Sequence, residues 1–386
     1  MTLSIINYSY NNSNLKRSVN KNLTGLFVYY YDILTLIMDK ITKQYSPEVL
    51  KATWQKMVQP YTHSDLRRSL AQIADSFLPY VALWVLMGLS LRISYWLTLI
   101  LIVPAAAFLV RLFIIFHDCG HGSFFKSKTA NRRVGFWLGV LTFTPSEAWW
   151  HAHAVHHATA GNLDRRGMGD VLTLTVREYQ EATWFKRLAY RVFRFPLVMF
   201  LIGPIFSFLI IPRIPTKSMS RMEKMSVILT DLALLAVFGI ISAVFGWQAY
   251  VLIQLPVMWL AGMAGIWLFY IQHQFEESYW VKNEEWDYAR AAFEGASYYK
   301  LPKILQWFSG NIGFHHIHHL SPRIPNYLLE KAYLENPFLR NAPTFDMTSG
   351  LKAISLGLYD EAADKMIYFA DLKDRAKSPE LHPTEG

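Results

Sequence analysis

The sequence predicts an all-α integral membrane protein with two transmembrane helical hairpins (four crossings), interfacial helices and a histidine-rich cytoplasmic cap. Of its 386 residues, 52% are hydrophobic and only 17% are charged, whereas an average globular domain is charged at roughly a quarter of its positions. Several apolar runs are long enough for a bilayer crossing, which needs about 20 residues. Lys and Arg gather beside these runs, as the positive-inside rule predicts.

The first predicted hairpin consists of residues 77–91 and 94–116. Two arginines at 67–68 precede it, and a Lys/Arg cluster at 126–133 follows it. Because basic flanks stay in the cytoplasm, both ends of this hairpin are expected there. The next apolar block, 134–145, is too short to cross and predicts a half-helix or interfacial segment.

The apolar run at 195–212 differs from the others because Lys and Arg flank it on both sides and it contains three prolines. We interpret it as a segment that dips into or lies on the cytoplasmic leaflet, with a genuine crossing as the alternative. The runs 225–246 and 248–271 predict the second hairpin, whose outer turn is uncharged. Four crossings place both termini in the cytoplasm.

Three parts are expected along the chain. Residues 1–46 are predicted to be a variable N-terminal extension, residues 47–372 the membrane domain, and residues 373–386 a C-terminal tail. The extension is rich in Asn, Ser and Lys and has no small-residue cleavage site, so it is a poor signal peptide. The membrane domain is expected to begin with an amphipathic, charged helix over residues 47–76.

Charge and cysteine content restrict the chemistry. The net charge is +9, but the basic residues lie beside apolar runs, and no zinc-finger spacing or basic helix indicates nucleic-acid binding. The single cysteine, Cys119, excludes an intramolecular disulfide, an iron–sulfur cluster and a thiolate zinc site. Histidine and carboxylate side chains would therefore have to hold any metal.

Most of the 13 histidines lie in three clusters, at residues 117–121, 151–157 and 315–319, and His273 follows the last apolar run. In the predicted topology all four places are on the cytoplasmic side. A crossing at 195–212 would put the third cluster on the opposite side. The convergence of the clusters is thus a second argument for four crossings.

Spacing within the clusters places imidazoles on common helical faces, because residues three and four apart lie on one face. His151 points elsewhere, and His316 is ambiguous. The nine ligand candidates are His117, His121, His153, His156, His157, His273, His315, His318 and His319. One tetrahedral zinc uses at most about four ligands, so nine imidazoles suit two metal ions. Imidazole alone does not choose among Fe, Cu, Ni and Zn.

A metal-bound imidazole usually has its second ring nitrogen held by a carboxylate or a carbonyl. The candidates for this role are Asp118, Asp164, Asp170, Glu276 and Asn311. No catalytic side chain is expected beyond the metal ligands.

An HxxxH box, two HxxHH boxes and two membrane hairpins resemble the integral-membrane fatty acid desaturases, a family of histidine-box diiron enzymes. The resemblance covers roughly residues 50–370. The sequence around the boxes is similar to bacterial and cyanobacterial acyl-lipid desaturases of the delta-12 (omega-6) type. The similar segments are HDCGHGSFF, HAVHHATAGNLDRRGMGDVLTLTV, WLFYIQHQFEESYW and LQWFSGNIGFHHIHHLSPRIPNY. By position it implies that the nine candidates are iron ligands and that His151 and His316 are not. The second box departs from the pattern in opening with WWHAHAVHH.

The resemblance also implies a reaction. Two iron ions (Fe2+/Fe3+) would use O2 as co-substrate to insert a cis double bond into an acyl chain held in an apolar tunnel between the hairpins. Electrons would come from an external donor, a ferredoxin-like or other small carrier. The substrate would be an acyl-lipid or acyl-CoA, and delta-12 insertion into an oleoyl chain rests on the resemblance alone. A multi-pass protein of the bacterial inner or thylakoid membrane is expected.

Other functions stay open at this point. A fatty acyl hydroxylase or conjugase, or a carotenoid hydroxylase or ketolase, would use the same histidine-box scaffold. A metal transporter is less favoured, because transporters place ionisable groups near the bilayer midplane. A structural zinc site would leave ligands in surplus. Arg111, inside the second apolar run, is interpreted as snorkelling to the cytoplasmic surface, with pairing near the metal site as the alternative.

Overall fold

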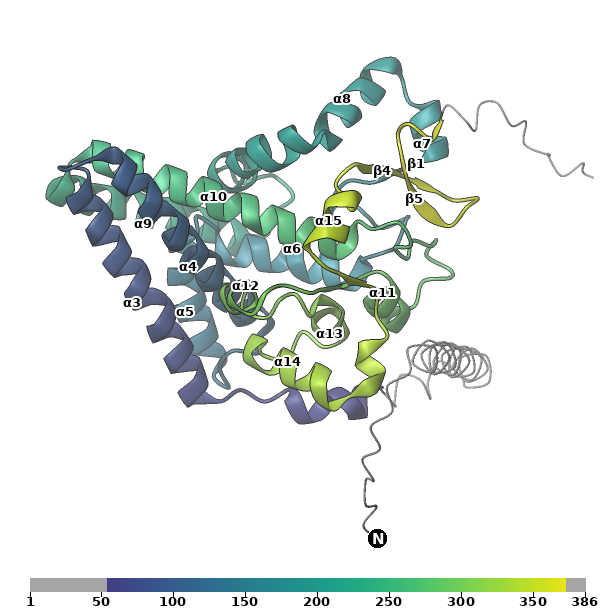
Figure 1. The fold of residues 1–386 in the computed structure, drawn as a ribbon, viewed down its shortest axis with the longest axis horizontal. Coiled ribbons are helices and arrows are strands. Elements are labelled where there is room, and N and C mark those ends of the chain that lie inside the picture. The colour runs from purple at the N-terminus through teal and green to yellow at the C-terminus, as the bar shows by residue number, and fades with distance from the viewer. Residues whose placement is uncertain (1–53, 373–386) are drawn as a thin grey trace, which may run out of the picture. The chain divides into compact units, whose positions relative to one another are not determined.

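The computed structural model describes residues 54–372 (Figure 1). The predicted N-terminal extension (1–46) and C-terminal tail (373–386) lie outside the described residues. Four described helices are long and apolar enough to cross a membrane: α3 (Leu66–Ser90), α4 (Tyr95–His121), α9 (Arg221–Phe245) and α10 (Trp247–His273). They correspond to the four predicted crossings, so the all-α membrane fold with two helical hairpins is confirmed.

The first spanning helix begins earlier than expected. Asp65 caps α3 by accepting hydrogen bonds from the backbone amides of Arg67 and Arg68. The charged helix predicted over residues 47–76 is interrupted: residues 54–58 are helical, the 3-10 turn η1 (Gln59–Tyr61) follows, and residues 62–65 are not helical. The prediction of a separate helix ending at residue 76 is therefore wrong. Three polar residues of this stretch, Ser69, Gln72 and Ser76, are buried on α3, and the Gln72 side-chain amide donates to Asn326 Oδ1 at 2.8 Å.

Helix α4 is the centre of the membrane core and packs against α3, α10 and α5 (Lys128–Leu141). Its side chains Leu112, Ile115 and Phe116 are fully buried. It ends at Gly122, whose φ of 66° lies in the left-handed region that glycine adopts at little cost. The 14 residues of α5 are too few to cross, in agreement with the short segment predicted there.

The proline-containing run at 195–212 forms a bent unit. Helix α8 (Trp184–Arg194) is followed by the π-helical segments η2 (Val198–Ile202) and η3 (Ile205–Ile210) and the 3-10 turn η4 (Ile211–Arg213). The two halves meet at 68°, which suits either a broken span or a re-entrant segment. Prolines remove backbone donors and favour such irregular helical geometry. The re-entrant interpretation stays a prediction.

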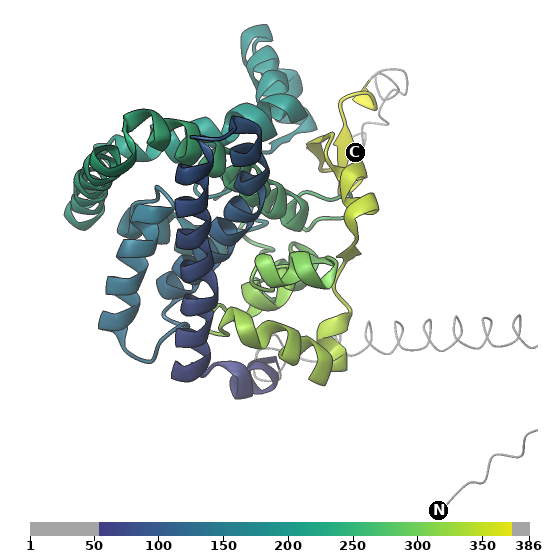
Figure 2. The same cartoon turned by 60° about the vertical axis from the view of Figure 1, so that its left-hand side comes forward.

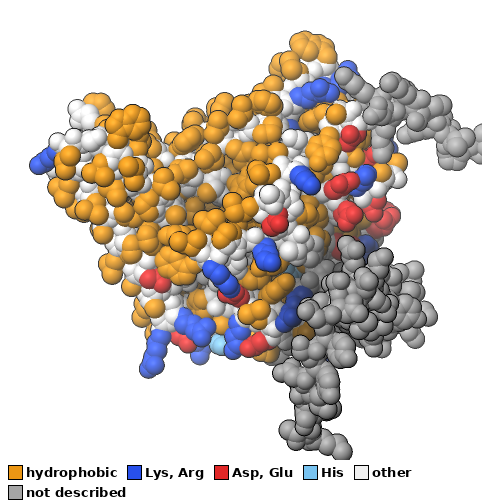
Figure 3. All heavy atoms as spheres, viewed as in Figure 1, with side chains coloured by type: hydrophobic (Ala, Val, Ile, Leu, Met, Phe, Trp, Pro, Cys, Tyr) orange, Lys and Arg blue, Asp and Glu red, His pale blue; other side chains and the backbone are white. Residues whose placement is uncertain are grey.

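Helix α8 buries only two of its side chains and exposes its apolar ones. Tyr190 and Arg194 are buried against the protein, whereas Trp184, Phe185 and Leu188 are exposed. Figure 3 shows hydrophobic side chains over the spanning helices and also over α8. A helix that exposes its apolar face beside membrane spans is expected to lie in the lipid interface.

The remaining elements form a cap, which lies to one side of the spanning helices (Figures 1 and 2). Its helices are α6 (Ser146–Thr159), α7 (Val176–Glu181), α11 (Tyr288–Glu294), α12 (Lys303–Phe308), α13 (His315–Leu320), α14 (Asn326–Glu335), the 3-10 turn η5 (Pro337–Arg340) and α15 (Met347–Ala353).

The cap also contains short strands that the sequence reading did not predict. Strands β1 (Leu174–Thr175), β4 (Leu356–Asp360) and β5 (Lys365–Tyr368) form one sheet, and β2 (Tyr298–Tyr299) pairs with β3 (Thr344–Phe345). The antiparallel β4–β5 pair is fully buried along β4. Strands of four or five residues are too short for hydrophobic periodicity to distinguish them from the end of a helix.

Candidate metal centre

Four segments that are distant in the sequence bring the nine predicted histidines together. The last turn of α4 carries two of them, α6 three, the last residue of α10 one, and α13 three. They form a five-histidine group, His117, His121, His153, His157 and His318, and a four-histidine group, His156, His273, His315 and His319. Within each group the potential ligand nitrogens all lie within 4.8 Å of one another.

The closest contacts join Nε2 atoms. In the four-histidine group, His315 Nε2 lies 2.9 Å from His273 Nε2 and 3.1 Å from His319 Nε2. In the other group, His318 Nε2 lies 3.0 Å from the Nε2 atoms of His117 and His157. A neutral imidazole has only one N–H, so nitrogens that converge in this way suit a shared cation better than a chain of hydrogen bonds.

His121 Nε2 is buried and has no hydrogen-bond partner in the described part of the chain. A buried nitrogen without a partner is costly unless a ligand satisfies it. The two groups of imidazole nitrogens therefore fit two metal ions.

Burial lowers the pKa values of five of these histidines, which lie in α6 and α13. Desolvation, helped by the neighbouring rings, holds the pKa values of His153, His157 and His318 well below the usual 6.5. The same causes lower the pKa values of His315 and His319. Since a metal binds the unprotonated ring nitrogen, protons compete weakly for these groups at neutral pH.

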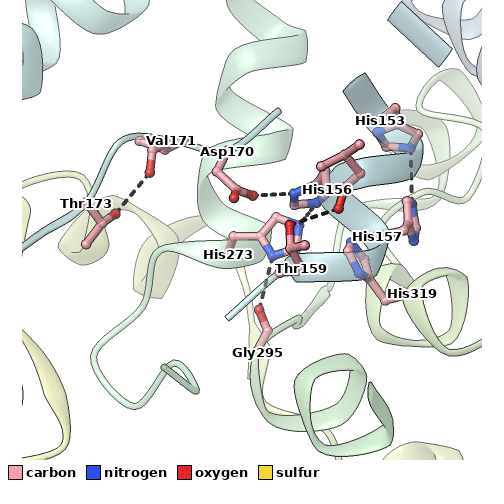
Figure 4. Close-up of polar contacts among 12 residues, drawn as sticks. His153, His156, His157, Thr159, Asp170, Val171, Thr173, His273, Gly295 and His319 are labelled. Carbon is pink, nitrogen blue, oxygen red and sulfur yellow. Dashed lines mark hydrogen bonds and ion pairs between the residues drawn. The ribbon is translucent and has the colours of Figure 1, made fainter. Parts of the chain in front are cut away.

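Two of the five predicted supporting residues hold ligand rings. His117 Nδ1 donates to Asp118 Oδ1 at 3.0 Å, and His156 Nδ1 contacts Asp170 Oδ1 (Figure 4). A third ring is held by the backbone, because His273 Nδ1 donates to the Gly295 carbonyl at 3.1 Å. Each contact leaves the Nε2 lone pair free for a metal. Gly295 could not be predicted from the sequence, because any residue can offer a backbone carbonyl as a hydrogen-bond acceptor.

The other three predicted supporting residues hold loops instead, which corrects the expectation. Asp164 accepts from the Asn283 amide at 2.8 Å. Glu276 pairs with Lys365 at 2.9 Å. Asn311 takes a left-handed turn with φ 58° and donates to a carbonyl at 3.2 Å. Each is near a histidine in sequence, but its local turn directs the side chain away from the rings.

Asp118 has a further partner that sequence spacing could not reveal. Its second oxygen, Oδ2, accepts from the backbone amide of Asn326 at 2.7 Å and from its side chain at 2.9 Å. Asn326 begins α14, 208 positions away in the sequence. This contact fixes the carboxylate that in turn orients His117.

The two histidines set aside by spacing are in neither group. His316 is fully buried, and its Nε2 donates to the Leu339 carbonyl at 2.7 Å. Desolvation lowers its pKa to about 4. His151 is largely exposed and pairs with Glu223 at 2.8 Å.

Arg111 does not snorkel, so that interpretation is wrong. The residue is 6% exposed, and its Nε donates to Ser76 Oγ at 3.0 Å. Its guanidinium pairs with Asp75 at 3.5 Å and lies 3.8 Å from the ring centroid of Trp307. The neighbouring helix α3 offers a carboxylate and a hydroxyl at this level, so the side chain is satisfied inside the protein. It joins α3 and α4 to α12.

An apolar cavity of about 640 Å³ ends at the histidines. His117 and His153 of one group and His315 of the other border it. Its walls come from α4, from one face of α10 and from the bent segment η2–η4, including Phe113, Gly265 and Phe208. This cavity lies between the two hairpins, where the tunnel was expected.

Comparison with known proteins agrees with this geometry. The model of the family "Fatty acid desaturase" matches residues 94–347. A "Fatty acid desaturase" of Bacillus subtilis is 48% identical over 318 residues, which cover 82% of this chain and 90% of the relative. An "sn-1 acyl-lipid omega-3 desaturase (ferredoxin)" of Synechocystis sp. is 26% identical and covers 79% and 76%. A chloroplastic "sn-2 acyl-lipid omega-3 desaturase (ferredoxin)" of Helianthus annuus is 28% identical and covers 59% and 53%.

Proposed function

This chain belongs to the fatty acid desaturase family, and we propose that it is a diiron acyl-lipid desaturase that inserts a cis double bond into an acyl chain. The observation that supports this most strongly is the position of both histidine groups at the end of one apolar cavity. A cavity of this kind holds an unbranched hydrocarbon chain by burial alone. The cavity requires no polar anchor at the reacting carbons.

We propose that each histidine group holds one iron ion. When bound, two irons would supply the O2-derived oxidising power that no amino-acid side chain has for an unactivated CH2 group. Asp118, Asp170 and the Gly295 carbonyl set the tautomers and orientations of three ligand rings. The apolar walls exclude water and align the chain with the histidines. No protein acid or base is assigned.

The finer assignment concerns the double-bond position. We propose that the double bond is inserted at the delta-12 (omega-6) position, which converts an oleoyl into a linoleoyl chain. The proposal rests on the similarity of the sequence around the histidine boxes to delta-12 desaturases. Two of the relatives are named omega-3 acyl-lipid desaturases, and the name of the Bacillus subtilis relative gives no double-bond position. A chain held in this cavity would lose hydrogen at the carbons that reach the histidines. The depth to which the acyl chain enters the cavity would therefore set the position of the double bond.

The proposed partners and location follow from the same assignment. Relatives named as ferredoxin-dependent acyl-lipid enzymes support a membrane lipid substrate and a ferredoxin-type electron donor. We assign the membrane domain to residues 47–372, between the N-terminal extension and the C-terminal tail. The histidine boxes are placed on the cytoplasmic side of a bacterial inner or thylakoid membrane, because Lys and Arg cluster at those helix ends.

Expression in a host that makes saturated and oleoyl chains but no dienes tests this function. Its fatty acid methyl esters are analysed for new double bonds and their positions. Linoleate is the expected product. A monounsaturated product from a saturated chain would keep the desaturase assignment and overturn delta-12. A hydroxy acid or an oxidised carotenoid would overturn desaturation itself.

A further inference from the structure

Arg194, the last residue of α8, is a buried cation without a buried anion. It is 3% exposed, and it forms no ion pair within residues 54–372. A buried charge of this kind is costly unless hydrogen bonds hold it closely. Arg194 lies outside both histidine groups, so metal binding by its own side chain does not explain a charge buried at this place.

Its hydrogen bonds go to three separate segments. Nη2 donates to Gln274 Oε1 at 2.9 Å and to the Leu356 carbonyl at 2.6 Å. Nη1 donates to the Leu172 carbonyl at 3.3 Å. Nη2 also lies 3.2 Å from the hydroxyl of Tyr270. Arg194 thus joins α8 to the end of α10, to β4 and to the loop at residues 170–173.

Gln274 strengthens the link between that loop and α10. Its Oε1 accepts a second hydrogen bond from Thr173 Oγ1 at 3.3 Å. Gln274 and Thr173 are 2% and 0% exposed, so water does not compete for these bonds. We call Arg194, Gln274 and Thr173 the loop clamp.

The loop clamp borders the four-histidine group on two sides. Gln274 directly follows His273, and the clamped loop begins with Asp170, the carboxylate that contacts His156 Nδ1. Figure 4 shows Val171 and Thr173 continuing from Asp170 on the side away from His156. The five-histidine group has no ligand on these segments.

We propose that Arg194 is a positioning residue for the four-histidine group: through the loop clamp it sets the place of Asp170, and thereby the orientation of His156. The inference rests on the proposed function, because it concerns one of the two proposed iron positions. Loss of an outer partner of a ligand typically weakens metal binding about 10–100-fold. The weakening should affect one iron and spare the other.

The test uses the full-length protein with Arg194→Gln, which removes the cation and most of its bonds. Thr173→Val is the second variant, because it deletes one clamp bond with little change of volume. Arg191→Gln is the matched control: Arg191 lies on the same helix and donates to Tyr179 Oη at 2.6 Å, away from the loop. Iron per chain is measured during exposure to a chelator, and the remaining iron is examined by electron paramagnetic resonance.

The expected result is rapid loss of one iron from Arg194→Gln, slower loss of one from Thr173→Val, and wild-type retention in Arg191→Gln. The iron left behind should give the signal of an isolated ferric ion. Wild-type retention of both irons in the Arg194 and Thr173 variants would overturn the inference. So would parallel loss of both irons, which indicates general destabilisation. A wild-type chain that binds no iron would instead overturn the proposed function.

Discussion

At the scale of single residues, the two nitrogens of three imidazoles make different contacts. Nε2 atoms converge within each group, while Nδ1 atoms of His117, His156 and His273 are held by two carboxylates and a carbonyl. Such outer contacts fix ring orientation before a metal arrives. Preorganisation of this kind matters because the rings come from four separate segments.

Substitutions of two adjacent histidines in α13, His315 and His316, can distinguish a metal ligand from a histidine with a structural role. His315→Ala should abolish product and lower the iron content, because His315 Nε2 faces His273 and His319. His316→Gln should keep both, since a glutamine amide can still donate to the Leu339 carbonyl, at a stability cost of about 1 kcal/mol. The measurements are fatty acid analysis, iron content and yield of membrane-inserted protein. An active His315→Ala protein would remove that residue from the proposed ligands.

The ligand candidates could be predicted because their spacing within helices is local information. The 3- and 4-residue intervals at 153–157 and 315–319 put three rings on one face in each case. The residues that support the rings were harder to predict. Asn326 reaches Asp118 only through the packing of α14 on α4, and Gly295 contributes a carbonyl. Arg194 looked like a basic flank because its burial depends on the cap.

At the scale of elements, the long apolar helices were predictable and the short ones were not. The spans α4, α9 and α10 follow from runs of about 20 apolar residues. The start of α3 was missed because its polar face, judged by sequence, resembles a surface helix. In the structure this face meets Arg111 and Asn326. The burial of Arg194 on α8 similarly depends on β4, whose Leu356 carbonyl accepts a hydrogen bond from it.

One face of α10 gives a test of the cavity. Met258, Gly262, Gly265 and Phe269 follow one another at intervals of three and four residues, and all line the cavity. A side chain added at Gly265 meets open space. Gly265→Leu should therefore occupy the cavity without disturbing the fold, and replacing a helical glycine should slightly stabilise α10.

We expect Gly265→Leu to lower turnover of long acyl chains at least about tenfold, because even one misplaced methylene in such a pocket costs about 1–3 kcal/mol. Gly239→Leu is the control, since Gly239 lies in α9, outside the cavity, and also meets open space. Both variants should bind iron normally. Unchanged rates and product positions in Gly265→Leu would mean that the acyl chain lies elsewhere.

At the scale of the whole molecule, the ends of two spanning helices and two helices of the cap bring two histidine groups together. The last residues of α4 and α10 carry His121 and His273, and α6 and α13 supply the other rings from segments outside the spans. Basic flanks predicted that these places share one membrane side. The division into groups of five and four could not be predicted, because it depends on how α6 and α13 pack. For example, His156 and His157 are adjacent yet belong to different groups.

The most direct test of the central claim is the metal content of the purified, full-length chain, measured by elemental analysis after isolation under reducing conditions. We predict two iron ions per chain, because nine imidazoles form two groups whose ring nitrogens converge. Replacement of a ligand in one group should leave iron in the other. A chain that holds a single zinc ion and no iron, and still makes desaturated product, would contradict the account.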